Sequence, residues 1–211
     1  VAKDGTIIVK KDELIETKTT NENGTLTYEA DLPLGEYYVK EITPAVGYIQ
    51  NTNIYDVDAT YNEDQRALIE INISYTSKKT NVEISKVDEQ KQMLPGAKLE
   101  IVDENGSQLY SWTSEEKGYV IRGLETNKTY TIKEQEAVSG YVTIEPITFQ
   151  IKSNGEIQTN AETEGSKIYV VNNTTKLEIE VRDIQTKEKI IGAKFEIYKV
   201  TTKEDGTKEE E

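Results

Sequence analysis

The sequence predicts an all-β protein built from tandem β-sandwich domains, and three observations support this. Residues that favour strands are plentiful, including 13 Tyr alongside many Ile, Val and Thr. Asn-Gly and Asp-Gly pairs, which favour tight turns, recur between the apolar stretches, and no segment shows a helical period. Finally, whole stretches of sequence recur at a spacing of about 95 residues, the size of one sandwich domain.

The repeated stretches define the domains. "NVEISKVD" (81–88) recurs as "KLEIEVRD" (176–183), "GAKLEI" (96–101) as "GAKFEI" (192–197), and "YYVKEITPAVGY" (37–48) as "YTIKEQEAVSGY" (130–141). We therefore expect a sandwich lacking its first two strands at 1–80 and a complete sandwich at 81–176. Residues 177–211 are expected to form the first two strands of a further repeat, or a donor segment that completes a neighbouring molecule.

The strands of the complete repeat follow from alternation and from β-branched or aromatic content, with turn signals such as "LPG", "ENG" and "SNG" between them. In order, they are expected at Val82–Val87, Lys98–Val102, Gln108–Thr113, Tyr119–Ile121, Thr129–Glu134, Ile147–Lys152 and Lys167–Asn172.

Composition excludes several function classes. With 39 acidic against 25 basic residues and a formal charge of −14, the chain is a poor partner for nucleic acid or an anionic membrane. His and Cys are both absent, which argues against disulfides, the usual zinc sites and His-based catalytic triads. We expect no metal and no cofactor. Because the first residue is Val, we also expect a window cut from a longer or processed chain.

One polar residue interrupts the apolar face of three strands in the complete repeat. In "VEISKVD", Lys86 shares a face with Val82 and Ile84 when the strand is read with a period of two. By the same parity Glu134 follows Tyr130 and Ile132, and Asn172 follows Ile168 and Val170. A lysine near a strand end often extends its ammonium into solvent, but three coincident inward polar residues favour a common site.

These three residue types suit one reaction. Burial disfavours charge, so it favours a neutral Lys86 amine, which is a nucleophile, and a protonated Glu134. The carboxamide of Asn172 is an electrophile, and Glu134 between them can hydrogen-bond and polarise the amide carbonyl and then transfer protons as ammonia leaves. The predicted product is an internal Lys–Asn isopeptide bond, formed once per molecule, so the chain is not expected to be a turnover enzyme.

A family resemblance rests on the same residues. "ISKVD…LPGAKLEIVDENG…WTS…YTIKEQEAVSGY…ITFQI…IYVVNN" resembles the B-type repeats of Gram-positive collagen adhesins (Cna B-type) and the SpaA-type pilin domains. The resemblance covers residues 82–172 and implies a prealbumin-like, inverse-Ig fold. It also implies that Lys86 and Asn172 are the cross-linked pair and Glu134 the catalytic acid/base. The family's usual Ala-Pro after this Glu reads Ala137-Val138 here.

The flanking repeats depart from this pattern. Glu41 occupies the position of Glu134, but Ile69, Ile71, Ile73 and Tyr75 run along the last strand of the first repeat, with Tyr75 near the acceptor position. Val181 stands where Lys86 would be. We therefore expect no isopeptide bond in this type of repeat. Within the complete repeat Asn173 competes as acceptor, but its side chain should point outward.

The resulting expectation is a structural stalk or shaft segment of a Gram-positive surface adhesin, pilus or appendage. It would be secreted, located at the cell wall, and stabilised by the autocatalytic bond, with neighbouring repeats or subunits of the same fibre as partners. Two alternatives remain open: a ligand-binding adhesin module for host matrix protein or glycan, and a fibre subunit that assembles by inter-chain strand donation. No nucleic-acid partner and no membrane contact are expected for this segment.

Overall fold

The computed structural model describes residues 9–28, 33–59, 74–198, 200–202 and 208–210. Every regular element among these residues is a β-strand, so the all-β prediction is confirmed. The chain divides into two compact units, Val1–Thr174 and Thr175–Glu211. In the described part, no helix is long and apolar enough to cross a membrane.

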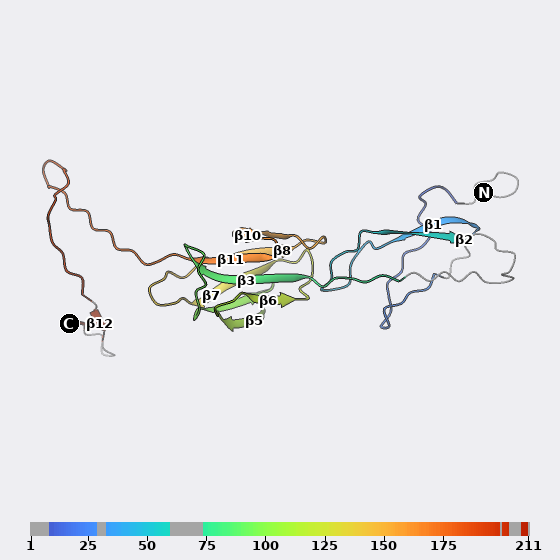
Figure 1. The fold of residues 1–211 in the computed structure, drawn as a ribbon, viewed down its shortest axis with the longest axis horizontal. Helices are drawn as coiled ribbons and strands as arrows, with labels where there is room; N and C mark the ends of the chain where they lie inside the picture. The colour runs from blue at the N-terminus through green and yellow to red at the C-terminus, as the bar shows by residue number, and fades with distance from the viewer. Residues whose placement is uncertain (1–8, 29–32, 60–73, 199, 203–207, 211) are drawn as a thin grey trace. The chain divides into compact units, whose positions relative to one another are not determined.

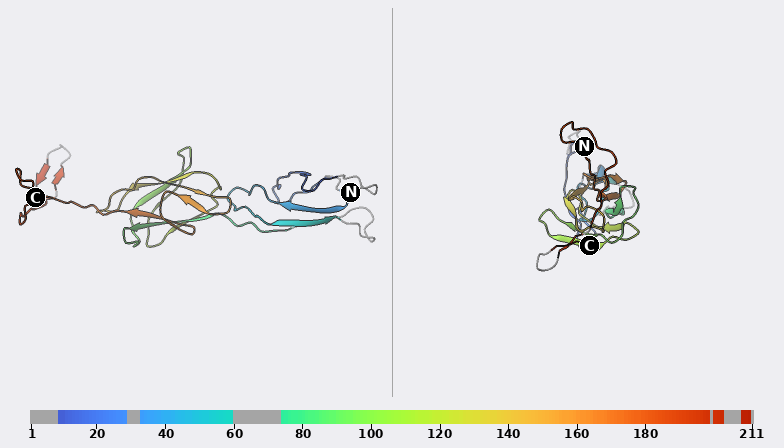
Figure 2. Two further views of the ribbon diagram at one scale, coloured as in Figure 1. Left: turned by 90° about the horizontal axis from the view of Figure 1, so that it is seen from above. Right: turned by 90° about the vertical axis from the view of Figure 1, so that its left-hand side faces the viewer.

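The complete repeat is a sandwich of two sheets (Figures 1 and 2). The four-stranded sheet has the order β10-β11-β3-β6, formed by Thr163–Glu164, Lys167–Asn172, Asn81–Asp88 and Tyr119–Arg122. The five-stranded sheet has the order β5-β4-β7-β8-β9, formed by Gln108–Thr113, Lys98–Val102, Tyr130–Glu136, Ile147–Ile151 and Ile157–Thr159.

The first and last long strands of this repeat are direct neighbours. β3 and β11 pair in parallel, with Val170 opposite Lys86 and Asn172 opposite Asp88, whereas the other pairs of strands in the two sheets are antiparallel. Figure 1 shows the two strands side by side. A parallel pair needs a long crossover, and here the rest of the repeat supplies it.

The core lies between the two sheets and is strongly apolar. Its largest fully buried members come from both layers: Ile84, Ile121 and Ile168 from one, Leu99, Ile101, Ile132, Phe149 and Ile151 from the other. Trp112 of β5 stacks on Tyr119 of β6 with ring centroids 4.5 Å apart, which joins edge strands of the two sheets. Such stacking adds to the stabilisation from burial alone.

The predicted strands agree closely with the observed ones. The ends of β4, β5 and β11 are those predicted, and β7 continues two residues beyond its predicted end, to Glu136. The sequence did not predict β9 and β10, which have three and two residues. Strands this short do not display enough alternation to be recognised from sequence.

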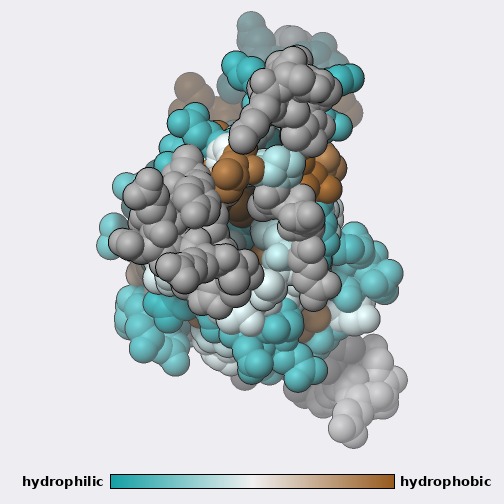
Figure 3. All heavy atoms as spheres, turned by 90° about the vertical axis from the view of Figure 1, so that its right-hand side faces the viewer, coloured by the Kyte–Doolittle hydropathy of each residue, from teal (hydrophilic) through white to brown (hydrophobic). Residues whose placement is uncertain are grey.

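In the first repeat, β1 (Gly35–Lys40) and β2 (Ile54–Ala59) form an antiparallel pair. The predicted run of Ile69, Ile71 and Ile73 lies outside the described residues. Several large apolar side chains of this repeat are exposed, among them Leu14, Leu34, Val46 and Ile54. Figure 3, which faces this end of the molecule, shows apolar surface in contact with solvent.

In the second unit, β12 (Val200–Thr202) pairs with β13 (Lys208–Glu210). Residues 177–211 were expected to form the first two strands of a further repeat. No strand is assigned at 177–198, where the described pairing is a single bridge between Arg182 and Lys189. The apolar side chains of this stretch are exposed, namely Leu177, Ile179, Ile184, Ile190, Ile191, Phe195, Ile197 and Tyr198. A strand pair with no second sheet to cover its apolar face is marginal in water.

Candidate cross-link site

The structure brings Lys86, Glu134 and Asn172 together inside the complete repeat. Lys86 and Asn172 come from the paired strands β3 and β11, and Glu134 reaches them from β7 in the opposite sheet. Lys86 is 1% exposed, Asn172 is 0% exposed, and the side chain of Glu134 is also 0% exposed. The three polar groups therefore meet without access to water.

Glu134 lies between the other two side chains and contacts both. Its Oε1 is 3.6 Å from Nζ of Lys86. The Nδ2 of Asn172 donates to Oε1 at 3.1 Å and to Oε2 at 3.0 Å. A carboxyl group in this position can exchange protons with both nitrogen atoms without moving far.

The electrostatics of Lys86 reflect two opposing influences. Burial lowers its pKa to about 8, and the nearby Glu134 partly offsets this effect. Nζ also donates to the backbone carbonyl of Val170 at 3.0 Å. Removing a proton from this lysine is consequently much easier than from a lysine in water, which favours the nucleophilic amine.

The amide of Asn172 has a defined orientation. Its Nδ2 donates to the carbonyl oxygen of Val142 at 2.9 Å as well as to Glu134, whereas its Oδ1 is buried without a hydrogen-bond partner. We expected Glu134 to face the amide carbonyl, but it faces the nitrogen. The reason is Val142, because a flipped amide would place two carbonyl oxygens against each other.

Backbone groups complete the site, and residue types in the sequence gave no indication of them. The N–H of Ile144 donates to Oε2 of Glu134 at 2.9 Å, and that of Val142 donates to the carbonyl of Asn173 at 2.9 Å. Both groups belong to the loop that follows the acid strand. The sequence offered one indication that this loop matters, namely the "GY" motif, which recurs in the loop that follows Glu41.

The competing acceptor Asn173 lies on the other face of its strand. It is exposed, whereas Asn172 is buried. This follows from the two-residue period of a strand, which points neighbouring side chains to opposite faces. Asn172 is thus the amide that contacts Glu134.

The first repeat contains a related arrangement around Glu41. Oε2 of Glu41 accepts from the N–H of Asn51 at 2.6 Å, just as Glu134 accepts from Ile144 ten residues downstream. The Tyr75 hydroxyl lies 3.5 Å from Oε1 of Glu41. Partial burial and the charge of Glu41 raise the pKa of Tyr75. A phenol offers no electrophilic carbon to an amine.

The second unit lacks the donor. The carbonyl of Val181 accepts from the N–H of Ile190 at 2.9 Å, and the carbonyl of Lys86 accepts from the N–H of Leu94 at 2.9 Å. The two segments share this local pairing, so Val181 occupies the position of Lys86. The nucleophile is absent there.

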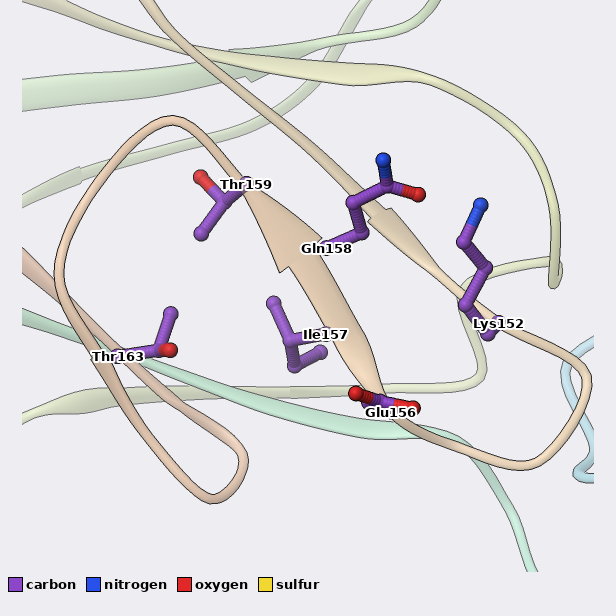
Figure 4. Close-up of a pocket in the computed structure, with 6 residues that line it drawn as sticks. All are labelled: Lys152, Glu156, Ile157, Gln158, Thr159 and Thr163. Carbon is purple, nitrogen blue, oxygen red and sulfur yellow. The ribbon is translucent and has the colours of Figure 1, made fainter.

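A surface hollow in the described part of the chain differs in character from the buried site. A hollow of about 310 Å³ lies beside β9 and is lined by Lys152, Glu156, Ile157, Gln158, Thr159 and Thr163 (Figure 4). Its polar side chains do not converge on one point in this view. In the described part of the chain, no group of three or more acidic side chains is arranged to hold a metal ion.

The fold defines a class of protein, namely prealbumin-like β-sandwich modules. The family model described as "SpaA: Prealbumin-like fold domain" matches residues 3–74 and 80–165, more than half of the chain. The chain therefore belongs to the SpaA family of prealbumin-like domains, and the predicted family is confirmed. Domains of this family are structural modules and not enzymes.

Comparison with solved structures gives distant similarities. The Bacillus anthracis TIE protein is 25% identical over 84% of this chain and 32% of its own, with a TM-score of 0.43. A streptococcal ancillary pilin is 26% identical over 68% of this chain and 43% of its own, with a TM-score of 0.35. The pilus adhesin SpaC from Lactobacillus rhamnosus GG is 17% identical over 70% of this chain, with a TM-score of 0.40.

The chain spans about a quarter of the SpaC adhesin. A comparison with curated proteins finds no match.

Proposed function

We propose that this chain is a force-carrying stalk segment of a Gram-positive surface adhesin, pilus or related appendage, braced by an isopeptide bond between Lys86 and Asn172. The observation that carries the proposal is the dry contact of Glu134 with both the Lys86 amine and the Asn172 amide nitrogen. The organisation would be one complete sandwich at 81–176 between partial repeats at 1–80 and 177–211. Membership of the SpaA family supports a role at the cell surface.

The proposed reaction uses the observed geometry in three steps. Glu134 takes a proton from the Lys86 ammonium, and the neutral amine attacks Cγ of Asn172. Glu134 then protonates Nδ2, which is already in contact with it, and accepts the remaining proton from the attacking nitrogen. The Cγ–Nδ2 bond breaks, the departing ammonia takes this proton from Glu134, and the products are one Nζ–Cγ amide and one ammonium ion. No oxidant or cofactor enters this balance.

Folding supplies most of the rate acceleration. Well-oriented groups in one molecule react with effective concentrations of about 10⁵–10⁸ M. Proton transfer by a positioned carboxyl adds about 10²–10⁴-fold. Since the three side chains come from strands far apart in the sequence, the reaction would begin only after the sandwich has formed.

Intact mass under denaturing conditions tests the proposal. The wild-type chain should be lighter than its sequence by one ammonia, and fragmentation should recover a peptide pair joined at Lys86 and Asn172. Lys86→Ala and Asn172→Ala should restore the sequence mass, whereas Asn173→Ala, the matched control on the outer face, should keep the deficit. A wild-type chain at full sequence mass would reject the cross-link.

A second candidate, inter-chain strand donation, is favoured by one observation. The apolar residues of 177–198 correspond to buried ones in β3 and β4, yet they are exposed, and so are apolar side chains in the first repeat. Residues 177–198 of one molecule could cover the first repeat of another. Sedimentation at increasing concentration should then show oligomers that disappear when residues 175–211 are deleted. Monomers at every concentration would exclude this mode.

A further inference from the structure

We infer that the first two repeats are held in a fixed relative orientation by a specific interface, called the joint below. In this interface a loop of the first repeat contacts the adjoining turns of the second repeat. The joint consists of residues 47–50 and Thr80 together with the turns at Gly123–Leu124 and Ser153–Gly155. All of these residues belong to one compact unit. The inference does not depend on the isopeptide bond, since no cross-link residue takes part.

The first observation is that no flexible linker separates the first two repeats. Tyr48 pairs with Lys79, and the N–H of Ile49 donates to the carbonyl of Lys78 at 2.8 Å. Strand β3 of the next repeat begins at Asn81. One residue, Thr80, therefore stands between the last pairing of the first repeat and the first strand of the second, where a flexible linker would need several residues.

The second observation is that Thr80 is bonded to both sides. Its N–H donates to the carbonyl of Gly47 at 2.9 Å, and its carbonyl accepts from the N–H of Gly123 at 3.1 Å. Its hydroxyl donates to the carbonyl of Leu124 at 2.6 Å. Thr80 is 0% exposed, so these bonds are made away from water, where an unpaired group would be costly.

The third observation is a close fit between the loop of the first repeat and turns of the second. The N–H of Gln50 donates to the carbonyl of Ser153 at 2.9 Å. A Cβ on Gly47 would lie 2.7 Å from the carbonyl oxygen of Gly123, and one on Gly155 would lie 2.6 Å from Cδ1 of Ile49. Gly47 therefore permits an approach of two backbones that other residues would block, whereas the end of the Ile49 side chain could move away from a Cβ on Gly155.

The loop that makes the joint is itself repeated. In the second repeat Gly140 has φ +89°, close to +81° at Gly47, and the N–H of Tyr141 donates to Val138 at 3.0 Å as that of Tyr48 donates to Ala45. Tyr141 pairs with Thr174 as Tyr48 pairs with Lys79. The shared "GY" motif thus encodes the same local turn in both repeats, although nothing lies within 4 Å of a Cβ on Gly140.

Two glycine variants with the same backbone strain test the joint. Gly47 and Gly106 both have φ +81°, but nothing lies within 4 Å of a Cβ on Gly106. Gly47→Ala should reduce the hydrogen-exchange protection of the Gln50 and Gly123 amides by about tenfold or more, given the cost of unpaired buried groups. Gly106→Ala should leave both amides unchanged. Thr80→Val, which removes only the hydroxyl, provides the same test if Gly47→Ala does not fold.

Residual dipolar couplings add a second measurement. In the wild-type chain, residues 33–59 and 81–172 should share one alignment tensor, and Gly47→Ala should separate the two tensors. Independent tensors in the wild type, or equal effects of Gly47→Ala and Gly106→Ala, would overturn the joint. The intact-mass deficit should persist in Gly47→Ala, so failure of the joint and failure of the cross-link are distinguished.

Discussion

Lys86 is a fully buried lysine whose partners explain why it is tolerated. A lone ammonium in an apolar core is strongly unfavourable. Here Glu134 at 3.6 Å and the carbonyl of Val170 at 3.0 Å compensate part of the cost, and the lowered pKa shows that compensation is incomplete. Conversion of the amine into an amide would remove the charge permanently.

The roles of the two related glutamates can be separated by matched variants. Glu134→Gln should abolish or greatly slow the loss of ammonia, because a neutral amide cannot take the proton from Lys86. Glu41→Gln should leave the mass deficit unchanged, since Tyr75 offers no electrophile. Intact mass measured over time after refolding gives both rates. Equal behaviour of the two variants would contradict a catalytic role for Glu134.

The burial of Lys86 also predicts a pH effect in an unreacted protein. Asn172→Ala keeps Lys86 and Glu134 but removes the electrophile. The folded pKa of about 8 lies below the ordinary lysine pKa of 10.5, so between these values the unfolded chain binds more protons. The free energy of unfolding should therefore rise as pH increases from about 8 to about 10.5.

Denaturant titrations at several pH values measure this slope. The double variant Lys86→Met/Asn172→Ala serves as the reference, because it lacks the amine whose ionisation produces the slope. The free energy of unfolding of the double variant should not rise over this pH range. Parallel curves for the two proteins would show that the pKa of Lys86 is not lowered in the folded state.

At the scale of elements, the parallel pairing of β3 and β11 decides what the cross-link can do. The two strands enter and leave the repeat, and their register places Lys86 beside Val170, two residues before Asn172. Tension on the chain ends would load their hydrogen bonds in shear. A covalent bond between these strands would shield the segment between them from force.

The strand β7 carries both the acid and the centre of the core. Ile132 is 0% exposed and lies two residues before Glu134 on the same face. Ile132→Ala should destabilise the repeat by about 2–5 kcal/mol through lost burial and a cavity. We also expect slower cross-linking, because Glu134 would be held less firmly. Denaturation of the Lys86→Met background isolates the stability effect from the reaction.

An unchanged midpoint for Ile132→Ala in that background would contradict the core assignment. Lys133→Ala is a suitable control, since Lys133 lies on the opposite face of the strand and is partly exposed. Its effect on stability should be within about 0.5 kcal/mol.

At the scale of the whole molecule, the cross-link would close a loop of about 86 residues. By analogy with disulfides, the lower entropy of the unfolded chain would raise the free energy of unfolding by about 4–5 kcal/mol. Lys86→Met should lose a stability increment of this order. Chemical denaturation of the wild type and of Lys86→Met measures it. Coincident unfolding curves would show that no covalent closure exists.

Single-molecule pulling gives a more direct reading. When the chain is stretched from its ends, Lys86→Met should release roughly 300 Å of additional contour length from the second repeat, at about 3.3–3.6 Å per residue. The wild type should not release this length. Equal released contour lengths in the two proteins would contradict a covalent bond between β3 and β11.

The sequence by itself determined the class of fold, the period of the repeats and the inward placement of Lys86, Glu134 and Asn172. These properties depend on local alternation, and a strand has a fixed side-chain period of two. For the same reason the ends of β4, β5 and β11 were predictable. The family followed from residues in the same strands.

Only the tertiary structure decided which atoms meet. The carbonyl of Val142 turns the Asn172 amide nitrogen towards Glu134, Ile144 orients the acid, and Thr80 joins two repeats. These contacts are made by backbone groups or by residues brought together from distant strands and turns. Residue type and periodicity carry no information about backbone donors and acceptors, because every residue except proline supplies the same pair.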